Sequence, residues 1–246
     1  MNHQLLSLAL LGLLCQVTWC PVARALEEPN PVKAVSPEPR KAAWWTKRHD
    51  AKIAALKKQD RVDLLMIGDS ITHSWESKGK KTWAEYYADR NAFNIGYSGD
   101  RTEHVIWRLQ HGEIDGISPK LAVIMIGTNN TGHRQDPPKD TAAGIKAILA
   151  ILKKKLPKTK ILLLGVFPRG ATRDDKLRKI NVGINQIIKS FADGQRVHFL
   201  DLSSTFLDDK GNLPKSVMPD LLHPNEDGYG MWAKAQEPMI KKLLGE

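Results

Sequence analysis

Residues 62–71 read Val-Asp-Leu-Leu-Met-Ile-Gly-Asp-Ser-Ile, an apolar run that ends in a small polar turn. The run, Val62–Ile67, does not alternate between polar and apolar side chains, which is typical of a parallel strand covered on both faces. Further runs of the same kind span residues 92–95, 121–126, 161–166 and 197–200. The sequence therefore predicts five buried strands.

Helical patterns lie between the apolar runs. Isoleucine and leucine recur every three or four residues in 145–156 and in 177–191, and residues 225–244 read as a closing helix. Strands that alternate with helices predict an α/β fold, a three-layer α/β/α sandwich around a five-stranded parallel sheet. We see no internal repeat and no second domain, so residues 42–246 are expected to form a single domain.

Residues 1–25 are expected to be a signal peptide rather than part of the fold. Residues 5–14 are apolar and uncharged, and Ala-Arg-Ala at 23–25 is a small-x-small cleavage pattern. The apolar stretch is too short for a membrane anchor. A lipoprotein with lipid on Cys15 or Cys20 is the weaker alternative, because a bulky residue precedes each cysteine. We expect an exported protein, periplasmic or extracellular, without stable membrane insertion.

Residues 26–41 contain four prolines among charged residues, which predicts an extended, Pro-rich linker. Residues 42–58 then read as a helix. Trp44 and Trp45 leave two interpretations, a platform that stacks on a sugar or aromatic packing against the body of the protein. We favour packing, because large aromatic side chains usually bury area.

The composition limits the class of protein. A chain of 246 residues with 41% hydrophobic side chains can bury a core, and it is neither collagen-like nor disordered. Lys+Arg exceed Asp+Glu by 37 to 27, but the lysine runs lie near predicted helix ends, where cations suit the helix dipole. A solvated basic face is the favoured interpretation, and attraction to an acidic polysaccharide stays open. We expect no nucleic-acid partner, because the chain has no aromatic-basic binding motif.

No metal or cofactor is expected. Both cysteines lie in the predicted signal peptide, so the mature chain would have no thiol nucleophile and no Cys₄ zinc site. His104, His111 and His198 show no metal-ligand spacing. The oligomeric state is not predicted by the sequence.

Small polar turns follow three of the predicted strands, at residues 68–71, 96–102 and 127–130, and a fourth at 220–224 precedes the last helix. In an open parallel sheet, ligands bind at the carboxyl ends of the strands. The turns should therefore lie together at the carboxyl ends of the strands. Between them they contain every catalytic group that a serine hydrolase needs: a nucleophile, a base, its carboxylate partner and oxyanion donors.

The residue types fit that chemistry. Ser70 lies where a buried strand passes into a helix, which exposes its hydroxyl and directs backbone N–H groups at the reaction centre. His223 can accept the serine proton in its neutral form, and Asp220 can bond the other ring nitrogen and fix the tautomer. The candidate donors to an oxyanion are the N–H groups of Ser70 and Gly99 and the side-chain amide of Asn129.

Each motif is weak by itself. Asp69 could merely cap a helix, Asn129 could make a turn, and His223 before a proline could be structural. Their order along one predicted edge of the sheet favours the joint interpretation. A rival nucleophile, Ser98, begins like a Gly-x-Ser-x-Gly elbow, but the fifth position is Asp100. Separate substitution of the two serines decides between them.

The chain resembles the SGNH hydrolases, the GDSL-type esterase/lipase family. The family blocks that match in order are Gly68-Asp69-Ser70, Gly99, Gly127-x-Asn129 and Asp220-x-x-His223. Within this family, residues 94–109 and 127–130 are similar to the platelet-activating-factor acetylhydrolase catalytic subunits. The similarity covers about residue 62 to the C-terminus.

This resemblance implies a flavodoxin-like SGNH hydrolase fold for residues 42–246. It also implies cofactor-free catalysis through an acyl-enzyme. By the resemblance, the nucleophile is Ser70, the base His223, its partner Asp220, and the oxyanion donors Ser70, Gly99 and Asn129. The residues that would line the acyl pocket are Ile71, Thr128 and Leu222, and their bulk favours a short acyl group such as acetyl.

Other polar residues of the turns keep two interpretations. Arg101 could meet an anionic leaving group, but a structural pairing with Asp100 or Glu103 is favoured. The residues that could line the leaving-group side or belong to solvated loops are His133, Arg134, Phe167 and Arg169.

The expected function is that of a secreted serine esterase that hydrolyses short-chain esters, acetyl esters in particular, of carbohydrates or small molecules. One alternative is a lysophospholipase or a lipid esterase like the platelet-activating-factor acetylhydrolases, less favoured because the predicted secretion signal departs from those cytosolic subunits. An alternative of another class is a non-catalytic binder of acidic glycans. A metal-dependent phosphoester hydrolase is a further alternative, which no ligand spacing supports.

Overall fold

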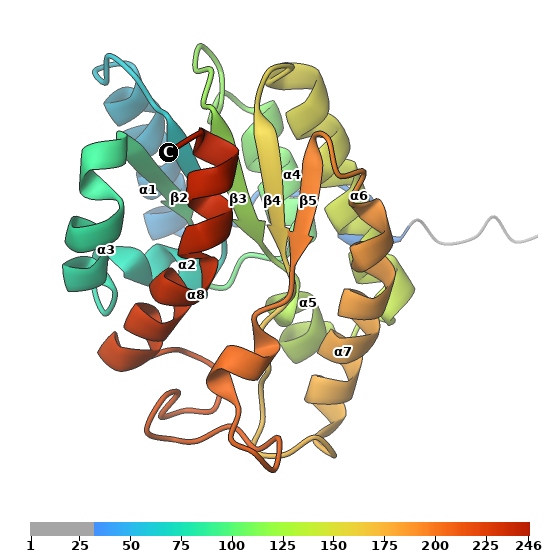
Figure 1. Ribbon diagram of the computed structural model, residues 1–246. Coiled ribbons are helices and arrows are strands. Elements are labelled where there is room, and N and C mark those ends of the chain that lie inside the picture. Colours follow the sequence, from blue (N-terminus) through green and yellow to red (C-terminus); the bar gives the residue numbers. More distant parts are fainter. Residues whose placement is uncertain (1–31) are drawn as a thin grey trace, which may run out of the picture. The chain divides into compact units, whose positions relative to one another are not determined.

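The computed structural model describes residues 32–246. The predicted signal peptide and the first part of the predicted linker lie outside the described residues. A five-stranded parallel sheet forms the centre, in the order β2-β1-β3-β4-β5 (Figure 1). Its strands are β1 Leu64–Gly68, β2 Ala92–Gly96, β3 Leu121–Met125, β4 Lys160–Leu164 and β5 Val197–Leu200. The predicted fold class is confirmed.

Both faces of the sheet are buried, which explains the uninterrupted apolar runs. Leu65 and Ile67 of β1 contribute to one hydrophobic cluster, whereas Leu64 and Met66 contribute to a second cluster. Side chains alternate between the two faces of a strand, so a strand covered on both sides needs apolar residues at every position.

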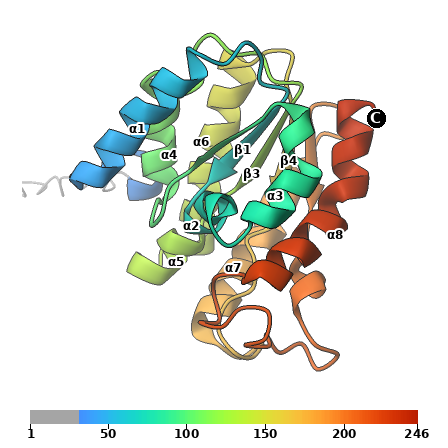
Figure 2. The ribbon, with the colours of Figure 1, turned by 90° about the vertical axis from the view of Figure 1, so that its left-hand side faces the viewer.

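Helices cover the two faces. Figure 2 shows α1, α4 and α6 on one side of the strands and α3 and α8 on the other, and α7 packs with the first group. The helices are α1 Ala43–Leu56, α2 Ser70–His73, α3 Lys80–Tyr86, α4 Thr102–Gln110, α5 Thr128–Arg134, α6 Pro138–Lys155, α7 Lys176–Ile188 and α8 Glu226–Leu244. The helices predicted near residues 145–156, 177–191 and 225–244 correspond to α6, α7 and α8.

The second half of the predicted linker differs from the expectation. Residues Lys33–Val35 form a short 3₁₀ helix, and Ala34 is buried. Thr102 Oγ1 donates to the Ala34 carbonyl at 2.8 Å. A Cβ at Gly144 of α6 would lie 2.5 Å from that carbonyl. The absence of a side chain at Gly144 therefore lets this segment dock against α4 and α6, so residues 32–41 belong to the folded body.

The two adjacent tryptophans have different environments. Trp45 is buried and its indole N–H donates to Asp100 Oδ1 at 2.7 Å. Trp44 is 42% exposed and stacks loosely on His73, with ring centroids 6.5 Å apart. The favoured interpretation, packing against the body, is therefore correct for Trp45 and does not describe Trp44.

The order of the strands determines where the polar turns meet. The chain runs from β1 outward to β2 and then crosses back to β3 on the other side of β1. Ligands bind in the crevice at such a switch point. The turns after β1, β2 and β3 all lie at this carboxyl edge. None of the helices in residues 32–246 has the length and hydropathy that a membrane span requires.

Candidate active site

Ser70 is the first residue of α2, directly after β1. The turn folds back closely over Gly68: a Cβ there would lie 2.9 Å from Cβ of Thr72 in α2, and 2.5 Å from the Met125 carbonyl of the neighbouring strand. Asp69 caps the helix by accepting the Ile71 N–H at 3.0 Å. The first N–H groups of a helix lack partners within it, so this turn directs backbone donors at the space beside the Ser70 hydroxyl.

His223 and Asp220 lie next to Ser70 although they are far away in the chain. Ser70 Oγ is 2.9 Å from His223 Nε2, and the two residues are separated by 153 positions. His223 Nδ1 is 2.6 Å from Asp220 Oδ2. A carboxylate can only accept, so Nδ1 carries the proton and Nε2 is free to accept the serine proton.

The loop that carries His223 is fixed by its own backbone. Asp220 Oδ1 accepts the N–H groups of His223 at 2.7 Å and Leu222 at 3.1 Å. Partial burial acts to raise the pKa of Asp220, but the interactions with His223 and the hydrogen bond from the Leu222 N–H together lower this pKa. Leu221 has a φ of 60°, in the left-handed region, and its carbonyl accepts the Gly170 N–H at 2.9 Å. The loop thus turns back and presents the imidazole.

The Gly99 turn and the Asn129 side chain are tied together. The Asp100 N–H donates to the Tyr97 carbonyl at 3.1 Å, and Gly99 has a φ of 76°. Asn129, in the first turn of α5, donates through Nδ2 to the Asp100 carbonyl at 3.0 Å. An amide nitrogen carries two hydrogens, so one of them is left for a ligand.

The three residues predicted for the acyl pocket each adjoin a residue of the site. Ile71 follows Ser70 and is buried, and half-buried Leu222 packs in the same hydrophobic cluster. Thr128 precedes Asn129 and is buried. Its carbonyl and its Oγ1 accept Nη1 of Arg169 at 2.8 and 3.2 Å. Arg169 thus braces the Asn129 turn.

A buried ionic network supports the Gly99 turn. The sequence did not predict this network. Arg108 Nε donates to Asp100 Oδ2 at 2.9 Å, and Arg108 Nη1 pairs with Glu113. Burial raises the pKa of Asp100 to about 6, against the opposing effect of Arg108. Arg101 pairs with Glu103 at 2.5 Å, so the favoured structural role of Arg101 is confirmed.

Ser98, the rival serine, has a histidine neighbour of its own. Ser98 Oγ lies 3.0 Å from His73 Nδ1. Burial, together with Arg48, lowers the pKa of His73 to about 4, so its imidazole is neutral at pH 7. The nearest carboxylate oxygen on the far side, from Glu76, is 3.9 Å from His73 Nε2, and Glu76 is already bound to Arg48 and Lys52. The serine–histidine–carboxylate chain is therefore continuous at Ser70 and broken at Ser98.

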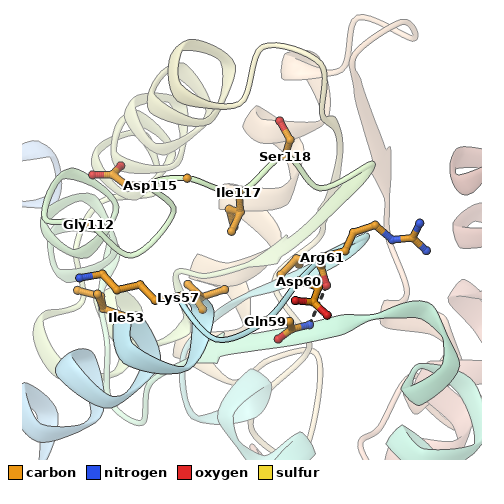
Figure 3. A pocket seen from close by; sticks show the side chains of 12 residues that line it. Ile53, Lys57, Gln59, Asp60, Arg61, Gly112, Asp115, Ile117 and Ser118 are labelled. Carbon is orange, nitrogen blue, oxygen red and sulfur yellow. Dashed lines mark hydrogen bonds between the residues drawn. The ribbon is translucent and has the colours of Figure 1, made fainter.

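The surface has pockets at both the carboxyl and the amino ends of the strands. Beside the imidazole is a pocket of about 310 Å³ lined by Lys78, Pro219, Asp220, His223, Pro224 and Asn225. Figure 3 shows a larger pocket, of about 600 Å³, between the end of α1, residues 59–62 and residues 112–118. Those segments lead into β1 and β3, so this pocket lies at the amino ends of the strands, whereas Ser70 lies at their carboxyl ends. No group of three or more candidate metal-binding side chains is found in residues 32–246.

Comparison with known proteins finds relatives over most of the chain. The profile of the GDSL-like Lipase/Acylhydrolase family matches residues 66–231. Platelet-activating factor acetylhydrolase IB subunit alpha1 of Homo sapiens is 32% identical over 220 residues, which cover 89% of this chain and 90% of that protein. Subunit alpha2 of Rattus norvegicus is 33% identical over 203 residues, 82% of this chain and 86% of that protein.

Solved structures share the fold. A GDSL-like lipase from Bacteroides thetaiotaomicron superposes with a TM-score of 0.66 at 22% identity, covering 80% of this chain and 97% of that one. An acetylxylan esterase from Geobacillus stearothermophilus gives a TM-score of 0.59 at 19% identity, covering 76% and 97%.

Proposed function

Because the chain belongs to the GDSL-like lipase/acylhydrolase family and is a carboxylic ester hydrolase, we propose that it removes short acyl groups, acetyl above all, from carbohydrate esters. Ser70 acts as the nucleophile, His223 as the base and Asp220 as its orienting partner. The observation that carries these roles is the unbroken chain of contacts from Ser70 Oγ through the imidazole to Asp220. A non-catalytic glycan binder is not favoured, because such a protein has no need of the unbroken contacts from Ser70 to Asp220.

The proposed reaction has two halves. His223 Nε2 takes the proton of Ser70 as its oxygen attacks the ester carbonyl, and the imidazolium is stabilised by Asp220. The negative oxygen of the tetrahedral intermediate is bound by the N–H groups of Ser70 and Gly99 and by Asn129. Collapse expels the alcohol, which receives the proton from His223. A water molecule then releases the acid from the acyl-serine by the same steps.

Three observations support the finer substrate assignment. Ile71 and Thr128 are buried next to Ser70 and Asn129, and their bulk, with that of half-buried Leu222 beside His223, favours a short acyl group over a long chain. Trp44 is 42% exposed and stacks on His73, whose Nδ1 contacts Ser98 beside Gly99. An exposed indole near a reaction centre provides an apolar face for a sugar ring. A solved structure of the same fold is an acetylxylan esterase.

A lipid acetyl ester is the second candidate substrate. The relatives at 32% and 33% identity are named as platelet-activating factor acetylhydrolase subunits. We favour carbohydrate because residues 1–25 read as a signal for export to the periplasm or the extracellular space, where polysaccharide esters are available.

The test is acetate release from acetylated xylooligosaccharides, p-nitrophenyl acetate and a 2-acetyl glycerophospholipid. Ser70→Ala should abolish turnover of every substrate while the fold survives, because no other hydroxyl within residues 32–246 has a continuous chain of contacts to a histidine and a carboxylate. Ser98→Ala is the matched control and should keep most of the turnover. Wild-type rates in Ser70→Ala would contradict the assignment, and a clear preference for the phospholipid would replace the carbohydrate by the second candidate.

A further inference from the structure

The peptide bond between Ser98 and Gly99 is held on one side by the N-terminal segment. Arg40 Nη1 donates to the Ser98 carbonyl. The same nitrogen lies 2.7 Å from the position that a Cβ would take at Gly99, so the guanidinium approaches this closely only because Gly99 has no side chain. Arg40 lies outside the region that matches the family profile, residues 66–231.

The geometry of the turn determines where the Gly99 N–H points. Residues 97–100 are closed by the hydrogen bond from the Asp100 N–H to the Tyr97 carbonyl, and Gly99 has a φ of 76°, as in a type II turn. In a planar trans peptide the C=O and N–H bonds point in opposite directions. Since Arg40 binds the carbonyl of Ser98, the Gly99 N–H points away from Arg40.

The charge of Arg40 is directed at this carbonyl and not neutralised by a close ion pair. By comparison, Arg108 and Arg134 are in close ion pairs, with carboxylate oxygens of Asp100 and Asp136 at 2.9 and 2.6 Å. Arg40 has Asp100 Oδ1 at 3.8 Å, and that oxygen already accepts the Trp45 indole N–H at 2.7 Å. The side chain of Arg40 is 26% exposed, so solvent screens it only in part.

We propose that Arg40 is a positioning residue of the oxyanion hole. Its guanidinium holds the Ser98–Gly99 peptide in one orientation and polarises it, which makes the Gly99 N–H a stronger donor to the developing oxyanion. Hydrogen bonds in series strengthen one another by about 10–30% per bond, and donors that are fixed in advance need no reorganisation during the reaction. The inference rests on the proposed function, in which Gly99 is an oxyanion donor.

Arg48 provides a matched control. It lies on α1, donates through Nε to the Gly96 carbonyl at 3.0 Å, and pairs with Glu76. It therefore ties the same segment to the same loop without touching the Ser98–Gly99 peptide. Arg48→Gln should lose stability but keep kcat within about twofold of wild type.

The experiment measures kcat and KM for p-nitrophenyl acetate in full-length Arg40→Gln, Arg40→Lys and Arg48→Gln. Complete loss of an oxyanion donor costs about 10²–10³ in kcat. We expect a loss of about tenfold in kcat for Arg40→Gln, because the donor is weakened but still present. KM should change by less than about twofold, as for an interaction made only in the transition state. Arg40→Lys, which keeps the charge, should recover part of the loss.

A second readout does not depend on turnover. The backbone amide ¹⁵N shift of Gly99 responds to hydrogen bonding at the Ser98 carbonyl, so it should move in Arg40→Gln and stay in place in Arg48→Gln. Equal kcat in the two glutamine variants, a loss that falls on KM alone, or an unmoved Gly99 shift overturns the proposal. Should Arg40→Gln not fold, the same comparison is made with Arg40→Lys. Turnover that survives in Ser70→Ala overturns the proposed function instead.

Discussion

At the scale of the residue, Asp69 combines a structural task with an unfavourable environment. One of its oxygens caps the helix that begins at Ser70, and the other, Oδ2, has no hydrogen-bond partner within residues 32–246. Burial raises the pKa of Asp69 to about 7, and the bond from the Ile71 N–H opposes that rise. The carboxyl is therefore partly protonated at neutral pH in the folded protein.

The raised pKa of Asp69 predicts how stability depends on pH. The folded state holds the proton up to about pH 7, whereas the unfolded state releases it near its ordinary pKa of 3.8. The contribution is fully present below pH 3.8 and is lost as the pH rises through about 7. Asp69→Asn keeps an acceptor for the Ile71 N–H but cannot ionise. Between pH 5 and pH 8, the wild type should lose on the order of 2 kcal/mol of unfolding free energy relative to this variant.

Denaturant unfolding of both proteins at the two pH values measures the difference. All other titrating groups are the same in the two chains, so the contributions of those that do not interact with Asp69 cancel. A stability gap that does not change with pH would contradict the raised pKa of Asp69.

At the scale of the element, α4 is anchored to the Gly99 turn by a buried cation. Arg108 is fully buried between Asp100 and Glu113, and its guanidinium lies 3.9 Å from the centre of the Tyr97 ring. The ion pairs tie the last turn of α4 to Asp100 in the turn before the helix and to Glu113 after it. Removing one member of such a group leaves buried charges without compensation.

Arg108→Met is therefore expected to destabilise the protein by about 3–5 kcal/mol, because it leaves the carboxylates of Asp100 and Glu113 unpaired in the core. Thermal or denaturant unfolding measures this loss. Arg61→Met is the control, since Arg61 pairs with Asp63 on the surface with its side chain 66% exposed. Surface pairs contribute about 0–1 kcal/mol. Similar losses in the two variants would contradict the structural role of Arg108.

The strands and long helices were predictable because each has a local signature. Continuous apolar runs identified the strands to within about two residues, and three- and four-residue spacing identified α6 and α7. The docking of residues 33–35 was not predictable. It depends on an alanine and on Gly144, more than one hundred positions away, which carry no signal when they are read separately.

At the scale of the whole molecule, topology accounts for three of the site residues that the sequence predicted. Ser70, Gly99 and Asn129 follow neighbouring strands of one parallel sheet, so their proximity follows from strand order. No comparable rule predicts the positions of Arg40 and of the ionic network around Arg108. Each depends on a side chain that crosses from another element, and only the packed structure brings those groups together.

Export is a prediction for the molecule as a whole. If residues 1–25 are a signal peptide, protein secreted by a host cell should begin at Leu26, which intact-mass measurement of the secreted protein checks. Substituting Ala25 with a bulky residue should leave the uncleaved precursor, because the peptidase requires small side chains there. Secretion of a chain that retains residue 1 would contradict cleavage.

The contact between Ser70 and His223 has a consequence for biosynthesis. The hydroxyl emerges from the ribosome 153 residues before the imidazole that, in the proposed mechanism, activates it. An unfinished polypeptide therefore carries an inert alcohol where the enzyme will have its nucleophile. On the proposed roles, a chain that ends before residue 220 should show no esterase activity, because it lacks the base.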